Sequence, residues 1–169
     1  MIFRLSQKLN TKIKAGPMDV VPLDENPFAD WSAHLFSADR TQYIIICNTK
    51  SLYSTVMYAK GITDDNRFIT QSLSSLREFM EDDGQECIYH RLIAPASATV
   101  RFAKPLDRSV IGSLNDLIYH ASVWLTEGEL SPHDVGFKLN NIPFSPLAYA
   151  NPREAFKKLV PAEYPTSKT

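Results

Sequence analysis

The stretch DRSVIGSLNDL at 107–117 holds the residues of this sequence that are best suited to binding a ligand. Its apolar positions repeat at the helical period, so a helix is expected to begin here, capped by Asp107 or Ser109. The first turn of a helix exposes free backbone N–H groups that carry about half a positive charge. A glycine near that turn lets an anion approach the backbone. The stretch therefore predicts a phosphate or carboxylate site formed by Arg108, Ser109, Gly112, Ser113, Asn115 and Asp116.

A structural explanation of Gly112 competes with the anion site. Glycine costs a helix interior about 1 kcal/mol relative to alanine, so its presence needs a reason. Close packing of the helix on a sheet is one such reason, with Arg108 left in a surface ion pair. The chain has neither a P-loop motif nor a G-x-G-x-x-G motif, so no established phosphate-binding sequence decides between the two explanations.

A catalytic trio is a further alternative, because Ser113, Asp116 and His120 are three and four residues apart on one helix face. A catalytic serine, however, normally occupies an exposed turn beside an oxyanion hole, and the chain has no G-x-S-x-G motif. A surface pair between Asp116 and His120 explains the spacing more simply. We therefore lean away from an enzyme and name no catalytic residue.

Three residues elsewhere are candidates for a groove or a contact surface. Trp31 and His34 fall on opposite faces of an expected strand, and Asn48 ends the next apolar strand. His34 would line a groove on the sheet, although a half-exposed strand histidine is the simpler expectation. Trp31 is either a core anchor or a contact residue. Asn48 is suited to stabilising the turn that follows its strand.

The pattern of histidines and cysteines predicts no metal site and no cofactor. No two of the four histidines have H-x-x-x-H spacing, and the two cysteines, Cys47 and Cys87, form no C-x-x-C pair. Cys47 ends the apolar run YIIIC, so its thiol is expected to be buried and inert. A reduced, cytoplasmic compartment fits this cysteine usage best.

Composition favours a soluble globular protein. The chain has 169 residues, of which 44% are hydrophobic and 22% charged, which suits one domain with a sizeable core. The net charge of −1 argues against a nucleic-acid partner, because such binders normally carry a strong basic excess. The start of the chain lacks the apolar core of a signal peptide, and no apolar run is long enough to cross a membrane.

Periodicity predicts an α+β fold that would position these residues. Strands are expected at 2–5, 31–37, 42–48, 52–59 and 97–104, and helices at 6–14, 67–82, 109–126, 131–140 and just after Asn151-Pro152. Residues 86–93 fit either a helix or a strand. The strands come early and pair locally, so we expect a mainly antiparallel sheet with an early meander and helices on one face. The chain is expected to form a single domain over 1–160, with a loose tail at 161–169.

Several blocks of the sequence resemble a family of uncharacterised bacterial proteins that is catalogued only as a domain of unknown function. The blocks are Trp31 with the following AHLF, Asn48 after its strand, RSVIGSLND at 108–116, and LNNIP at 139–143. The leucine at 114 replaces the usual methionine of the third block. The resemblance implies a soluble bacterial protein of one domain, assigns no activity, and adds Asn140 and Pro143 to the residues of interest.

Two functions remain open at this point. The absence of a catalytic motif and the near-neutral charge favour a non-enzymatic binding or interaction module with a protein or small-molecule partner. The alternative is a ligand-binding domain or enzyme that holds an anionic group at the start of the helix near Ser109.

Overall fold

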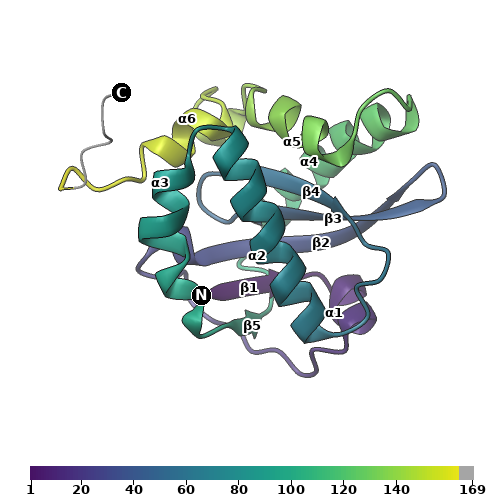
Figure 1. Ribbon diagram of the computed structural model, residues 1–169, viewed down its shortest axis with the longest axis horizontal. Helices are drawn as coiled ribbons and strands as arrows, with labels where there is room; N and C mark the ends of the chain where they lie inside the picture. The colour runs from purple at the N-terminus through teal and green to yellow at the C-terminus, as the bar shows by residue number, and fades with distance from the viewer. Residues whose placement is uncertain (164–169) are drawn as a thin grey trace.

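The computed structural model describes residues 1–163, which form one sheet with helices on both of its faces (Figure 1). The sheet has the strand order β4-β3-β2-β1-β5. Its strands are β1 (Ile2–Leu5), β2 (Asp30–Ala38), β3 (Thr41–Asn48), β4 (Ser54–Tyr58) and β5 (Arg101–Ala103). The α+β class is therefore confirmed, and most of the predicted tail at 161–169 lies outside the described residues.

The sheet is mixed, and its parallel part is the feature that the sequence did not predict. The predicted meander is present, because β3 pairs antiparallel with both β2 and β4. By contrast, β1 pairs parallel with both β2 and β5. A helix and a loop carry the chain back along the sheet between β1 and β2, so β2 enters in the same direction as β1. The pattern of a single strand reports which faces are buried but not the direction of its neighbours.

The helices begin largely where the sequence predicts. They are α1 (Gln7–Ile13), α2 (Asp65–Asp82), α3 (Glu86–Ile88), α4 (Arg108–Thr126), α5 (Pro132–Asn140) and α6 (Pro152–Lys157). Side chains of the preceding residues cap five of them by accepting a backbone N–H: Ser6, Asp64, Asp107, Ser131 and Asn151. The ambiguous segment 86–93 is helical, since α3 continues into a π-helical turn at Tyr89–Ile93.

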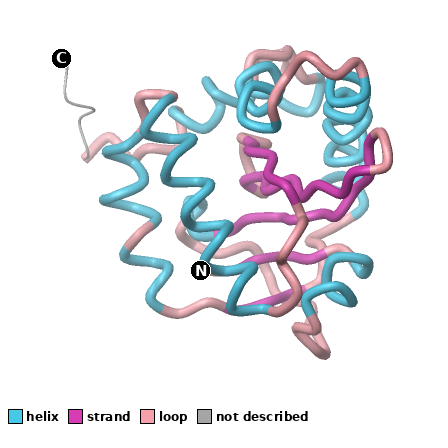
Figure 2. Tube along the Cα trace, turned by 45° about the vertical axis from the view of Figure 1, so that its right-hand side comes forward, coloured by secondary structure: helices cyan, strands magenta, loops and turns pink. Residues whose placement is uncertain are grey.

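Helices cover both faces of the sheet, which corrects the expectation of one covered face (Figures 1 and 2). On one face, Trp31 and Ile44 pack with Phe79 of α2 in a core cluster. On the other face, Ile45 packs with Leu117 of α4 in a second cluster. Successive residues of β3 are thus buried on opposite sides, as the uninterrupted apolar run of that strand requires.

A buried ion pair lies where β1 and β2 meet, outside both apolar clusters. The Arg4 guanidinium donates to both carboxylate oxygens of Asp30, through Nε and Nη2, at 2.8 Å each. Arg4 also donates to the carbonyl of Val21 at 2.7 Å, and Thr49 donates to Asp30 at 2.7 Å. Both charged side chains are fully buried, so these hydrogen bonds compensate for the water that they have lost.

Candidate functional site

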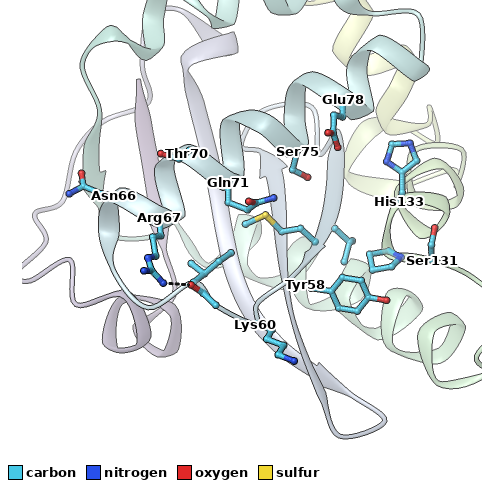
Figure 3. Close-up of a pocket in the computed structure, with 15 residues that line it drawn as sticks. Tyr58, Lys60, Asn66, Arg67, Thr70, Gln71, Ser75, Glu78, Ser131 and His133 are labelled. Carbon is cyan, nitrogen blue, oxygen red and sulfur yellow. Dashed lines mark hydrogen bonds between the residues drawn. The ribbon is translucent and has the colours of Figure 1, made fainter.

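A groove of about 710 Å³ runs between the outer edge of β4 and the polar side of α2 (Figure 3). We call it the β4 groove. Its strand side includes Met57 and Tyr58, and its far end is closed by Ser131, Pro132 and His133 at the start of α5. The groove is concave and combines apolar and polar walls, which is the usual character of a binding site.

The outer edge of β4 presents backbone groups that have no partner strand. The bonds Asn48 N–H to Tyr53 O and Ala59 N–H to Gln42 O show that the odd-numbered residues of this segment bond to β3. The N–H and C=O groups of the even-numbered residues therefore point away from the sheet. These residues are Ser54, Val56 and Tyr58.

The side chain of Asn140 in α5 bonds to both outward backbone groups of Ser54. Its side-chain amide donates to the carbonyl of Ser54 at 2.8 Å and its amide oxygen accepts the Ser54 N–H at 2.8 Å. The outward backbone groups of Val56 and Tyr58 make no hydrogen bond to any of residues 1–163. The Val56 side chain packs on the opposite face under α4, so Val56 reaches the groove through its backbone. The open part of the edge thus begins at Val56.

The α2 wall of the groove is a polar stripe. The apolar face of α2, which includes Phe68 and Leu76, packs on the sheet. The adjacent face turns its side chains toward the groove: Asn66, Arg67, Thr70, Gln71, Ser75 and Glu78 (Figure 3). These positions recur at three- and four-residue steps, so one continuous row of hydrogen-bonding groups faces the strand.

Charge is distributed unevenly along the groove. Lys60 and Arg67 lie at one end, and Glu78 and His133 lie at the other (Figure 3). Arg67 donates to the carbonyl of Gly61 at 3.2 Å and lies 3.5 Å from the carboxylate of Asp64, so Lys60 supplies the charge at this end that is not offset. The His133 ring is held by Asp82 of α2 at 2.8 Å. One end is therefore positive and the other end is negative.

The predicted anion site at the start of α4 lies on a different part of the surface. The carboxylate of Asp107 accepts the N–H of Val110 at 2.9 Å, which places a negative charge at this helix terminus. Arg108 and Ser109 are exposed, whereas Ser113 is buried. Anion binding here stays a prediction, with one of the free N–H groups already bonded by Asp107.

The packing explanation of Gly112 is wrong. Gly112 is exposed, and a Cβ atom at this position would meet nothing within 4 Å. The tightly packed glycine is Gly136 of α5, where a Cβ atom would lie 2.8 Å from Cε2 of Phe79. Sequence alone did not separate the two, because both are single glycines inside helical patterns.

His34 and Asn115 of the predicted set come together in a second cavity of about 920 Å³ between α1, the far half of β2 and α4. We call it the α1–α4 cavity. The expectation of a half-exposed strand histidine is wrong, since only 8% of His34 is exposed. Burial lowers the pKa of its imidazole from 6.5 to about 4.

The catalytic trio is not assembled in the part of the chain that the structure describes. Ser113 is buried, whereas Asp116 and His120 line a small surface hollow of about 220 Å³. The His120 ring stacks on Trp124, with 5.7 Å between ring centroids. No hydrogen bond or ion pair joins Asp116 to His120 within residues 1–163, so the expected surface pair is absent there as well.

Trp31 and Asn48 are parts of the interior. Trp31 is fully buried and its Nε1 donates to the carbonyl of Phe28 at 2.8 Å. The amide oxygen of Asn48 accepts the N–H groups of Lys50 and Ser51 at 3.2 and 3.0 Å. Asn48 therefore stabilises the turn after β3, as its position in the sequence indicates.

The remaining chemical groups add no further site. Cys47 is buried, and burial raises the pKa of its thiol to about 12, as expected for an inert cysteine. Within residues 1–163, no three side chains of histidine, cysteine, aspartate or glutamate are grouped so that they could hold a metal ion. The helices of the same residues are too short or too polar to span a lipid bilayer.

A family model described as a domain of unknown function (DUF6933) matches residues 2–155. The chain belongs to this family. No curated protein and no solved structure matches it. The DUF6933 description assigns no activity, so the functional interpretation of this domain depends on the geometry of its grooves.

Sequence reasoning missed the residues of the β4 groove in this DUF6933 domain. The polar positions of α2 were indistinguishable from an ordinary solvated helix face. One signal was available, because the last strand of a meander is an edge strand unless a later strand joins it. The segment LYSTVMYA at 52–59 is such a strand. Alternate residues of an edge strand direct their backbone N–H and C=O groups away from the sheet, which here are the even-numbered ones.

Proposed function

We propose that this DUF6933 domain is a non-enzymatic interaction module that binds an extended segment of a partner protein along β4. The observation that carries the proposal is the pair of unpaired outward residues, Val56 and Tyr58, beside a groove of about 710 Å³. An extended chain placed there would add a sixth strand and bond to the N–H and C=O groups of both residues.

The two ends of the groove define which segment fits. At one end Asn140 already bonds to Ser54, so an added strand pairs only from Val56 onward. Tyr58 is 56% exposed and offers an aromatic surface to the incoming chain. An acidic side chain of the partner is favoured near Lys60 and Arg67. The free thiols of Cys47 and Cys87 support placing this interaction in a reducing bacterial cytoplasm.

Amide hydrogen exchange with a selected peptide tests the proposal. Linear peptides are selected from a displayed random library, and exchange is followed by nuclear magnetic resonance with and without the best binder. The Val56 and Tyr58 amides are expected to become protected on binding, because they gain hydrogen bonds. The Thr55 and Met57 amides bond to β3 already and serve as the internal control.

Charge reversal provides a second readout. Arg67→Glu is expected to weaken a peptide that carries an acidic residue, whereas Arg77→Glu, the same change on α2 outside the groove, is expected to have no effect. The proposal fails if the library yields no binder, or if binders leave the Val56 and Tyr58 amides unprotected. It also fails if the edge is occupied by a second copy of the chain, which sedimentation of the free protein would reveal.

A further inference from the structure

The second half of β2 has an open side of its own. β1 ends at Leu5 and the chain turns into α1, so β2 continues past its parallel neighbour. The bonds Thr49 N–H to Asp30 O and Ser6 N–H to Ala33 O show that even-numbered residues of β2 face β3 and odd-numbered ones face β1. The backbone groups of Leu35 and Ser37 therefore point into the space that β1 has left.

That space is the α1–α4 cavity, and polar side chains converge on it. His34 and the exposed residues Ser37 and Asn115 all line the cavity, and their side chains make no hydrogen bond within residues 1–163. Only 8% of His34 is exposed, and its ring nitrogens make no hydrogen bond within residues 1–163 but are not sealed in the interior, so a ligand in the cavity can reach them. Phe36 and Ile118 supply an apolar wall beside these groups.

The charge beside the cavity comes from α1. Lys8, which is exposed, is the one charged side chain among the residues that line it, and Lys12 donates to Gln42 of the same lining at 3.4 Å. Burial keeps the pKa of His34 near 4, so the ring is neutral at physiological pH and offers one donor and one acceptor. The free backbone groups of Leu35 and Ser37 likewise combine donors with acceptors. A fitting ligand therefore needs both donors and acceptors.

We propose that the α1–α4 cavity is a second binding site, separate from the β4 groove, that takes a small uncharged polyhydroxyl ligand such as a sugar. Each hydroxyl both donates and accepts, so it can bond to any of the groups that converge here. The C–H face of a sugar ring would pack against Phe36 and Ile118. The cavity volume of about 920 Å³ is within the range of small-molecule sites.

Saturation-transfer nuclear magnetic resonance with a panel of D-glucose, D-galactose, D-mannose and D-ribose tests this site. At least one sugar is expected to bind and to shift the ¹⁵N resonances of the His34 ring. His34→Phe and Asn115→Ala are each expected to weaken that binding by roughly tenfold, which corresponds to one lost hydrogen bond. Gln71→Ala, which changes the β4 groove instead, serves as the matched control and should leave sugar binding unaltered.

The use of two variants distinguishes a loss of sugar binding from a folding defect. Asn115 is exposed on α4, so Asn115→Ala leaves the core unaltered even if His34→Phe disturbs it. The proposal is overturned if no sugar of the panel binds, or if binding survives Asn115→Ala and His34→Phe alike. It is also overturned if citrate or phosphate shifts the His34 resonances while the sugars do not, because the site would then select anions.

Discussion

Replacing each of two helical glycines by alanine separates a surface position from a packed one. Gly112 is exposed in α4, where an added Cβ meets nothing within 4 Å. Gly136 lies in α5, where the added Cβ would be 2.8 Å from Cε2 and 3.3 Å from Cζ of Phe79. Both residues lie inside helices with ordinary negative φ, so both alanines gain the same helix propensity.

The difference in unfolding free energy between the two variants gives the cost of packing the added methyl group of residue 136 against Phe79. Alanine is favoured over glycine by about 1 kcal/mol in a helix interior, so Gly112→Ala should stabilise the protein by about that amount. Phe79 is fully buried and its ring is enclosed by Tyr53, His133 and Phe137, with centroids 5.7, 5.4 and 4.6 Å away. The ring has little freedom to yield, and overpacking of this kind costs about 1–3 kcal/mol. Gly136→Ala should therefore be less stable than Gly112→Ala by about 1–3 kcal/mol.

Urea unfolding of the two variants and the parent protein measures these differences. Unchanged slopes against urea concentration would show that the differences belong to the folded state. Equal stabilisation by both alanines would refute the reasoning, since it would mean that α5 and Phe79 move apart at no cost. Destabilisation by Gly112→Ala would refute it as well, because the structure places nothing near that Cβ.

Two further predictions concern buried polar groups. Because burial lowers the pKa of His34 from 6.5 to about 4, its contribution to stability is complete above pH 6.5 and is lost as the pH falls through about 4. The loss is about 3 kcal/mol, so urea unfolding should show the parent protein losing about that much stability relative to His34→Phe as the pH falls through this range, and a difference that stays constant would contradict it. Asn140→Ala should destabilise the fold by about 2 kcal/mol, because both backbone groups of Ser54 lose their partner. Faster hydrogen exchange at Ser54 with unaltered exchange at Thr55 would confirm it, and unaltered exchange at both would contradict it.

The elements of the fold could be predicted because their signals are local. Asp107, Ser131 and Asn151 cap helices from positions that sequence rules identify, and the apolar run of β3 announces a central strand. The parallel pairing of β1 could not be predicted in this way. It depends on the path of the chain between strands, which no pattern within one strand records.

The candidate sites were only partly accessible to sequence reasoning. His34 and Asn115 were singled out for separate reasons, and only the fold shows that they share a cavity. The polar stripe of α2 is a candidate binding surface because the open edge of β4 lies across the groove from it. The sequence alone does not show that these two segments are adjacent in space. Asn140 belonged to a recognisable block, LNNIP, but its pairing with the backbone of Ser54 depends on how α5 is placed.

The position of β1 has a consequence for how the protein is made. β1 precedes the other four strands of its sheet in the chain, yet it lies between two parallel neighbours, and Ile2 pairs with Arg101. The β2–β4 meander can pair as it emerges from the ribosome, whereas one side of β1 remains uncovered until β5 follows. During that interval the nascent chain exposes a strand edge that the finished protein hides.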